Sequence, residues 1–186
     1  GLRPESGPPF DAPYRRFAIT ESGISPRLRP GIDGELVIAD SDEHTEDGHI
    51  TEDLDLRRRM VEKRLRKADG IAKEVIPPVF TGAANPELLL VEWGSSRGAV
   101  AEAAAILRAR GRMVSALHFP QVWPLVPWQF MGYLESARRV VCVEGNATGQ
   151  FARLLRRETG FHIAETILRY DGLPFTPDSI MRRLAL

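Results

Sequence analysis

The stretch 87-ELLLVEWGSSRG-98 decides how this chain is expected to fold. Residues 87–93 are mostly apolar, which is typical of a strand buried on both faces of a parallel sheet. Residues 94–98 form a turn rich in glycine and serine, and an alanine-rich helix over 99–110 follows, closed by Gly111. A strand that passes through a short turn into a helix predicts the first half of a β-α-β unit.

The same alternation continues toward the end of the chain. It predicts further strands at 113–118, 139–144 and 166–170, with helices at 128–137 and 150–159 between them. Pro127 stands where a first helical residue is favoured, and Gly160 stands where a helix is expected to end. This spacing predicts a parallel sheet that is covered by helices on both faces.

The part before residue 85 has a different character. Residues 1–35 are rich in proline and glycine, which predicts loops, and a short strand is expected at 36–39. An amphipathic helix is predicted over 51–75, capped by Thr51 or Asp53 and followed by two prolines. Its apolar residues near helical spacing are Leu54, Leu56, Met60, Val61, Leu65 and Ala68.

Composition excludes several classes of protein. The 25 basic residues balance 25 acidic ones, so a nucleic-acid partner is not expected. No run approaches the roughly twenty apolar residues of a membrane span, and the N-terminal residues lack the apolar region of a secretory signal. The single cysteine, Cys142, rules out an internal disulfide framework and a self-contained iron–sulfur cluster. A reduced, cytoplasmic setting is therefore expected.

The acidic stretch 40-DSDEHTEDGHITED-53 is a candidate metal site on composition alone. His44 and His49 are five residues apart, however, and metalloprotease histidines on a helix are four apart. An EF-hand register centred on Gly48 would place leucine at the twelfth position, where a bidentate glutamate is required. No metal is expected here.

Two loops stand where parallel sheets usually carry their function, at the carboxyl ends of strands. One contains Gly94, Ser95 and Ser96, and the other contains Glu144, Asn146 and Thr148. Each leads into the N-terminus of a predicted helix, where free N–H groups can hold an anion. Neither loop matches the dinucleotide or P-loop fingerprint, so a tight turn and an anion site are both open.

Several blocks of the sequence together resemble one enzyme family. They are 14-YRRFAITESGISPRLRPG-31, 42-DEHTEDGHITED-53, 63-KR-64, 93-WGSSRG-98, 144-EGNATGQ-150 and 170-YDGLPFT-176. In this order and spacing the chain resembles the C-terminal part of the α subunit of 2-oxoacid:ferredoxin oxidoreductases, which are thiamine-diphosphate enzymes.

The resemblance implies a fold and a division into domains. Residues 85–186 are similar to domain II of the family, a three-layer α/β/α domain with a mostly parallel sheet, like the C-terminal domain of transketolases. Residues 1–39 resemble the tail of domain I, the pyrimidine-binding-type domain. Residues 40–84 then form a charged inter-domain linker and amphipathic helix, so that an extended N-terminal arm precedes the α/β domain.

The resemblance also implies a function for the complete complex. Such a complex decarboxylates a 2-oxoacid oxidatively to acyl-CoA and reduces ferredoxin, using thiamine diphosphate with Mg, iron–sulfur clusters and coenzyme A. The thiamine diphosphate is carried by a β subunit, with γ and δ subunits where the complex has them. The Tyr-Pro-Ile-Thr-Pro segment that family members use near the substrate is absent here. This chain is therefore expected to carry no catalytic residue, to bind no cofactor alone, and to serve structure and assembly.

The remaining candidates follow from the same resemblance. Ser25, Pro26 and Arg27 are expected near the substrate or at an interface, because Arg27 is a permanent cation held between prolines. His44 and His49 are expected at an interface. The alternative is a free-standing α/β module that binds a small molecule or nucleotide through the loops 94–98 and 145–149.

Overall fold

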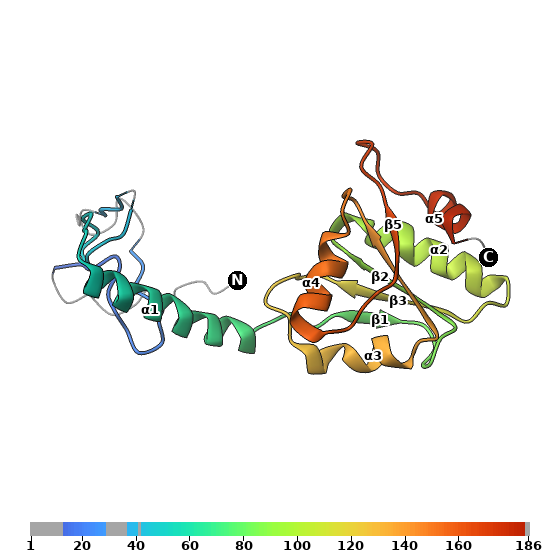
Figure 1. Ribbon diagram of the computed structural model, residues 1–186, viewed down its shortest axis with the longest axis horizontal. Helices are drawn as coiled ribbons and strands as arrows, with labels where there is room; N and C mark the ends of the chain where they lie inside the picture. Colours follow the sequence, from blue (N-terminus) through green and yellow to red (C-terminus); the bar gives the residue numbers. More distant parts are fainter. Residues whose placement is uncertain (1–12, 29–36, 41, 185–186) are drawn as a thin grey trace. The chain divides into compact units, whose positions relative to one another are not determined.

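The computed structural model describes residues 13–28, 37–40 and 42–184. The chain divides into two compact units, Gly1–Glu74 and Val75–Leu186. Figure 1 shows the elements of each unit. The boundary lies at the end of the long helix that the sequence predicts. The assignment of residues 1–39 to a pyrimidine-binding-type domain stays a prediction.

The second unit is built on a five-stranded sheet with the order β1-β3-β2-β4-β5. Strands β2 to β5 run parallel, and β1 pairs antiparallel with β3 at one edge. The strands are β1 (Val79–Thr81), β2 (Leu88–Trp93), β3 (Val114–Phe119), β4 (Arg139–Glu144) and β5 (Glu165–Leu168). The mostly parallel α/β fold predicted from the sequence is confirmed. The antiparallel strand β1 was not predicted, because three residues are too few to show a period.

Helices cover both faces of this sheet, as Figure 1 shows. Their bounds are α2 (Arg97–Ala109), α3 (Met131–Ser136), α4 (Gln150–Thr159) and α5 (Pro177–Arg183), with short 3-10 turns η1 (Gly94–Ser96) and η2 (Pro127–Gln129). One hydrophobic cluster joins the sheet to α2 and α5, and the other joins it to α3 and α4. The second unit therefore has the three layers that the alternation of elements requires.

Strand β2 explains the continuous apolar run at 87–93. Leu88 and Leu90 point into the cluster on the α2 and α5 side, whereas Leu89 and Val91 point into the cluster on the α3 and α4 side. All four side chains are buried. Each contributes about 1.5–3 kcal/mol by leaving water, so both layers depend on this one strand.

Several element boundaries differ by one or a few residues from the sequence-based prediction, and three of the differences have a visible cause. Helix α2 begins at Arg97 because η1 passes directly into it. The helix predicted over 128–137 is split at Phe130, whose backbone leaves the helical region at φ −142° while its ring enters the core. Strand β5 ends at Leu168 rather than at residue 170, because Arg169 turns back to bond Asp171 and the Pro174 carbonyl.

Helix α5 was not predicted, although the sequence contains its start signal. Thr176 is the N-cap, and its side chain and that of Ser179 bond reciprocally to the backbone as a capping box. Pro177 occupies the first turn, where a missing N–H costs nothing. Ile180 and Leu184 then complete the core against α2.

The first unit is organised around helix α1 (Leu54–Lys73). Asp53, one of the two capping residues that the sequence predicts, caps it by accepting hydrogen bonds from the N–H groups of Asp55 and Leu56. The Lys63 side chain is buried, and its Nζ donates to the Phe17 carbonyl at 2.7 Å and to Ser25 Oγ. Burial lowers the pKa of Lys63. Lys63 thus ties the loop over residues 13–28 to the helix.

The acidic stretch is folded within this unit. His44 and Ile50 form an antiparallel bridge around a turn at Thr45–Gly48. The Glu46 carboxylate accepts a hydrogen bond from the Ile19 N–H at 2.9 Å. No strand forms at 37–39, where one was predicted; residue 36 lies outside the described residues. That segment instead packs beside Gly48, whose absent side chain leaves room for the Ile38 carbonyl.

Helix α1 has its apolar residues on two faces rather than one. Met60 is buried and Leu56 is half-buried, as expected for an amphipathic helix. Leu54, Val61 and Leu65 are exposed, with exposed fractions of 79%, 39% and 63%. The buried face also includes Lys63, a residue that hydrophobic periodicity assigns to solvent.

The close contact at Gly23 gives a test of how the first unit is held together. A Cβ on Gly23 would lie 2.4 Å from the Lys63 carbonyl oxygen, and the residue has φ +76°. We expect Gly23→Ala to destabilise this unit by about 1–3 kcal/mol, because both strain and a backbone clash are introduced. Hydrogen exchange of the α1 amides measures the change.

Gly70 provides the matched control, since it lies inside α1 and an added Cβ there would meet no atom within 4 Å. Gly70→Ala is expected to slow exchange in α1, because alanine favours the helix by about 1 kcal/mol. Equal exchange in the two variants would contradict the packing of residue 23 on the helix.

Candidate functional site

The carboxyl ends of β2 and β4 form the topological switch point of the sheet. The chain passes from β2 to β3 on one side and then returns to β4 on the other. Open parallel sheets bind ligands at this point, outside the strand ends. The two loops singled out from the sequence, 94–98 and 145–149, leave these two adjacent strands. The structure therefore brings Gly94, Ser95 and Ser96 to the same sheet edge as Glu144, Asn146 and Thr148.

The side chain of Glu144 is the centre of this edge and is completely buried. Its Oε2 accepts hydrogen bonds from the Phe151 N–H at 2.8 Å, from Asn146 Nδ2 at 2.8 Å and from Trp93 Nε1 at 3.4 Å. Its Oε1 accepts from the Ala152 N–H at 3.0 Å. A carboxylate at the last position of β4 thus caps the helix that follows, where the helix dipole favours negative charge.

Asn146 completes the cap of α4 from within the loop. Its Oδ1 accepts hydrogen bonds from the N–H groups of Thr148, Gly149 and Gln150 at 3.1, 2.8 and 3.2 Å. Glu144 accepts hydrogen bonds from two further N–H groups. The N–H groups of residues 148–152 therefore all have partners within the chain. The 145–149 loop is therefore a turn whose N–H donors are taken by the chain's own side chains, and its geometry does not fit an open anion site.

The 94–96 loop differs from its neighbour. Gly94 has φ +62°, a left-handed conformation that glycine adopts without strain. Ser96 is buried but its side chain makes no capping bond to α2, whereas Gly94 and Ser95 are exposed. This loop leads into α2 through a continuous 3-10 turn, so it retains exposed backbone at the switch point.

A second buried acid, Glu92 on β2, lies on the opposite face of the sheet. Glu92 pairs with His118 on β3, with 2.7 Å between Oε1 and Nδ1, and both side chains are buried. Glu92 Oε2 is one of three buried side-chain atoms without a hydrogen-bond partner among the described residues. Burial raises the pKa of Glu92 to about 8, although Arg97 acts in the other direction. Burial and Arg97 both lower the pKa of His118.

The Glu92–His118 pair is consequently uncharged near neutral pH. Neither residue was predicted from the sequence, although a glutamate inside the apolar run 87–93 is a visible signal. His118 shows no such signal, because only the register of β2 against β3 places it opposite Glu92. The pair is a candidate for proton exchange, because a carboxyl group with a raised pKa lies 2.7 Å from an imidazole nitrogen near the ends of two strands.

The remaining predicted site residues lie in the first unit. Ser25 Oγ donates to the Ala18 carbonyl and accepts from Lys63, and the Pro26 carbonyl accepts from Tyr14 OH at 3.2 Å. Arg27 is exposed. The loop that carries it is thus held on both sides, and the guanidinium projects from a fixed backbone.

The two histidines of the acidic stretch are also in this unit. The His44 ring stacks on Phe17 with 4.2 Å between centroids, and its Nε2 is hydrogen-bonded to the Asp40 carbonyl. His49 pairs with Asp47 at 3.0 Å and is exposed. Within the described residues, no three side chains of His, Cys, Asp or Glu are grouped to hold a metal ion.

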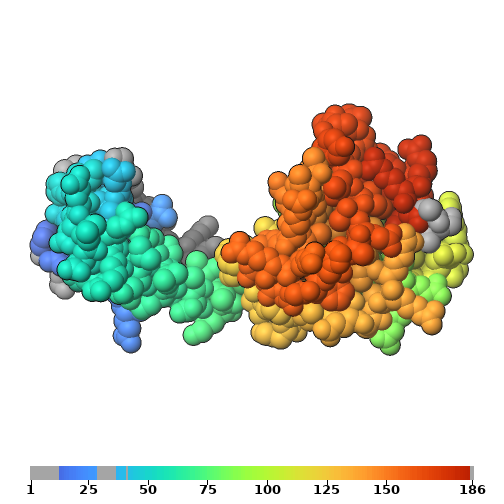
Figure 2. All heavy atoms as spheres, viewed as in Figure 1, coloured from blue at the N-terminus to red at the C-terminus, as the bar shows by residue number. Residues whose placement is uncertain are grey.

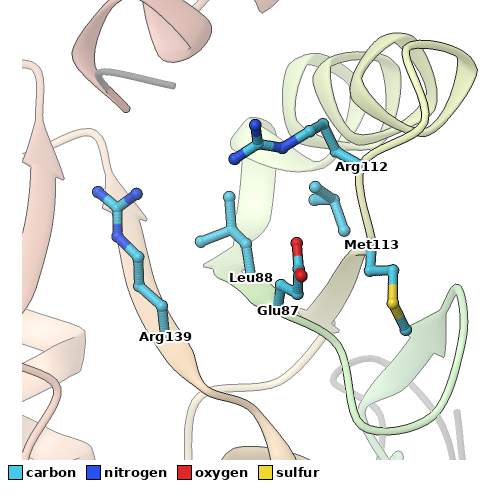
Figure 3. A pocket seen from close by; sticks show the side chains of 6 residues that line it. Glu87, Leu88, Arg112, Met113 and Arg139 are labelled. Atoms are coloured by element: carbon cyan, nitrogen blue, oxygen red, sulfur yellow. The ribbon is translucent and has the colours of Figure 1, made fainter.

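A small cavity lies at the other edge of the sheet, at the amino ends of β2, β3 and β4. It has a volume of about 140 Å³ and is lined by Glu87, Leu88, Arg112, Met113, Val114 and Arg139. Figure 3 shows the two guanidinium groups on either side of Leu88. Arg139 is engaged, since it pairs with Glu165 and donates to the Leu184 carbonyl. Arg139 therefore serves to join β4, β5 and the end of α5.

Comparison with known proteins places the chain beside one group of enzymes. No family model matches it. It is 32% identical over 183 residues to 2-oxoacid:ferredoxin oxidoreductase 1, subunit alpha, of Sulfurisphaera tokodaii, an alignment that covers 97% of this chain and 28% of that protein. It is 34% identical over 171 residues to the alpha subunit of 2-oxoacid:ferredoxin oxidoreductase 2 of Aeropyrum pernix, covering 90% of this chain and 26% of that protein.

A solved structure agrees with these relatives. The 2-oxoglutarate:ferredoxin oxidoreductase of Magnetococcus marinus, solved with 2-oxoglutarate, coenzyme A and succinyl-CoA bound, aligns with a TM-score of 0.77 at 28% identity. The alignment covers 95% of this chain and 31% of that one. The chain spans less than a third of the length of the curated relatives it matches.

The fold first defines a class, an α/β unit with a mostly parallel sheet, and the relatives place that unit in an oxidoreductase subunit. More specifically, the chain is a homologue of part of the α subunit of 2-oxoacid:ferredoxin oxidoreductases, and the resemblance stated from its sequence blocks is confirmed. None of the helices in the described residues is long and apolar enough to cross a membrane.

The hydrogen bonds of Glu144 predict that a single substitution there strongly destabilises the second unit. In Glu144→Gln the side-chain NH₂ must face N–H donors in either orientation, so at least one buried bond is lost and one repulsion is gained. We expect the free energy of unfolding of the second unit to fall by about 2–4 kcal/mol. Tryptophan fluorescence in urea reports on that unit alone, because Trp93, Trp123 and Trp128 all lie in it.

Glu87→Gln is the matched control, since Glu87 is an exposed glutamate just before β2. Its effect is expected to stay within about 0.5 kcal/mol. A Glu144→Gln variant as stable as this control would show that the carboxylate does not hold the edge together.

The Glu92–His118 pair predicts a pH dependence with a definite sign. The folded-state pKa of Glu92 lies above its ordinary value of 4.5, so its contribution to stability is complete below about pH 4.5 and is lost as the pH rises toward about 8. The lowered pKa of His118 acts in the opposite sense, because that contribution is lost as the pH falls below 6.5.

Glu92→Gln separates the two contributions, because glutamine keeps a partner for His118 and does not titrate. We expect the wild-type protein to lose stability relative to this variant as the pH is raised from about 5 to about 8. Urea unfolding followed by tryptophan fluorescence at several pH values measures the difference. A difference that does not change with pH would contradict the raised pKa of Glu92.

Proposed function

We propose that the chain acts as the C-terminal portion of the α subunit of a thiamine-diphosphate-dependent 2-oxoacid:ferredoxin oxidoreductase. The observation that carries the proposal is the similarity to that subunit over 97% of the chain, together with the structural match at a TM-score of 0.77. The complete complex would decarboxylate a 2-oxoacid oxidatively, form acyl-CoA and reduce ferredoxin in the cytoplasm.

In this proposal the chain supports structure and assembly and is not catalytic by itself. The α4 N-terminus is closed by Glu144 and Asn146, so its N–H groups are not free to hold a pyrophosphate or a carboxylate. Cys142 is buried, and burial together with Glu144 raises the pKa of its thiol, which keeps it protonated and unreactive. These features argue that the reacting groups lie elsewhere in the complex.

In this proposal the chain holds neither the iron–sulfur clusters nor the thiamine diphosphate of such a complex. A single buried cysteine cannot ligate an iron–sulfur cluster. The N–H groups of the 145–149 loop and the start of α4 are occupied by the chain's own side chains. Thiamine diphosphate with Mg and the clusters would accordingly be held by a β subunit or by γ and δ subunits, and coenzyme A would be bound in the assembled complex.

The loop with Ser25, Pro26 and Arg27 is the part of the chain that we place at an interface or near the substrate. Its backbone is fixed by Tyr14, whose OH also accepts the Leu28 N–H at 2.9 Å. Arg27 then offers an exposed planar cation on a held backbone, and the geometry of its guanidinium suits a carboxylate.

The two histidines differ in what they offer such an interface. His49 is exposed and pairs with Asp47, so its ring is accessible to another chain. His44 is largely engaged by Phe17 and Asp40 within the first unit. His49 is therefore the stronger interface candidate of the two.

A free-standing small-molecule or nucleotide module is the alternative, and the exposed loop 94–96 is the observation in its favour. The two functions predict different responses of the isolated chain to added ligands. Only the alternative expects coenzyme A, nucleotides or 2-oxoacids to raise its melting temperature, because ligand binding to the folded state stabilises it.

Co-expression with a β subunit of one of the similar oxidoreductases tests the proposal. We expect the two chains to purify together, and we expect Arg27→Glu to reduce the recovered β subunit about tenfold, corresponding to about 1.4 kcal/mol. Arg182→Glu, an exposed arginine on α5, is the control and should leave recovery unchanged.

Two results would overturn the assignment. One is the failure of the chain to purify with any β subunit of the family. The other is a clear ligand-induced rise in the melting temperature of the isolated chain, which would establish the alternative function in its place.

A further inference from the structure

Helix α1 carries an apolar seam that its own unit does not use. Leu54, Val61 and Leu65 are exposed, and Ala68 is exposed with them. The face that packs on the loop instead contains Met60 and Lys63. In Figure 2 the helix, coloured teal to green, lies at the surface of the first unit. A row of aliphatic side chains that recurs along a helix and faces solvent requires a partner surface.

The spacing of this seam is that of helix pairs. The residues follow the alternating steps of four and three that define the d and a positions of a heptad, with Leu54, Val61 and Ala68 at d and Arg58, Leu65 and Ala72 at a. Such a seam is two residues wide per heptad, which suits another helix and is too narrow for the core face of a globular domain. The small residues at 68 and 72 allow two helix axes to approach closely.

The charges that flank the seam indicate which helix can pair with α1. One flank, at the e positions, is acidic throughout and consists of Asp55, Glu62 and Asp69. The other flank, at the g positions, begins with Arg57 and Arg64 and ends with Ile71. A partner must therefore present bases to one side and acids to the other, and the helix itself has this pattern.

We propose that α1 pairs in parallel with α1 of a second copy of this chain. In a parallel pair each g residue meets the e′ residue five positions further along the partner, so Arg57 meets Glu62 and Arg64 meets Asp69. In an antiparallel pair g meets g′ and e meets e′, which sets arginine against arginine and acid against acid. The charge pattern thus favours the parallel arrangement over the antiparallel one.

Two further features indicate that the helix pair has a defined register and a low stability. Arg58 occupies one a position, and a polar residue there fixes register at a cost in stability. Arg64 already forms a bidentate pair with Glu43 within its own unit, so Arg57 is the freer of the two bases. The inference needs only α1 and is independent of the oxidoreductase activity proposed above.

Cysteine cross-linking of the full chain tests the pairing, and the native Cys142 is buried and does not interfere. Val61→Cys and Ala68→Cys each place a thiol at a d position. In a parallel pair both variants meet their own copy and form disulfide-linked dimers under mild oxidation, whereas an antiparallel pair can satisfy at most one of them. Arg59→Cys, an exposed residue outside the seam, is the matched control.

We expect at least about tenfold more covalent dimer from both seam variants than from the control, because a disulfide requires closely opposed Cβ atoms. Sedimentation should show that Glu62→Arg shifts the protein toward monomer, since it sets arginine against Arg57. The double variant Arg57→Glu with Glu62→Arg should restore the dimer, which simple unfolding would not do.

Three outcomes would overturn the inference. Seam variants that cross-link no more than the control would show that the chain does not pair with itself through α1. Cross-linking of only one d position would indicate an antiparallel pair. Loss of cross-linking when a β subunit is bound would show that the seam belongs to that partner and not to a second copy.

Discussion

The hydrogen bonds of Glu144 are the interaction on which the functional edge of the sheet depends. A carboxylate that is buried at the end of β4 is stable only because N–H donors from α4, Asn146 and Trp93 surround it. Through this one side chain, these bonds hold together the turn after β4, the start of α4 and the end of β2. They also consume the donors that would otherwise make this helix N-terminus an anion site.

Two buried glutamates near this edge of the sheet have different electrostatic surroundings. Glu144 faces the α3 and α4 layer and is satisfied by five donors, counting the Cys142 thiol. Glu92, one strand away, faces the α2 and α5 layer and has only His118, so burial raises its pKa to about 8. The face of the sheet on which each carboxyl group lies therefore decides which donors surround it.

The two units divide their roles in a way that suits part of a larger assembly. The second unit is closed on both faces of its sheet by helices. The first unit has a small interior, centred on Lys63 and Met60, and leaves an apolar seam of α1 in solvent. This exposed seam is the surface that the proposed pairing of α1 would cover.

The sequence alone determined the architecture of the second unit and the place of its loops, because a doubly buried strand such as 87–93 and its following turn have local, period-based signals. The bounds of β4 and α4 were predicted without error for the same reason. Only the tertiary structure decided what those loops do, since the donors that satisfy Glu144 come from β2, β4, the 145–149 loop and α4. It also paired Glu92 with His118 through strand register, and it buried Lys63 while leaving the apolar seam of α1 exposed. Those outcomes depend on which side chains meet in space, and no local pattern records that.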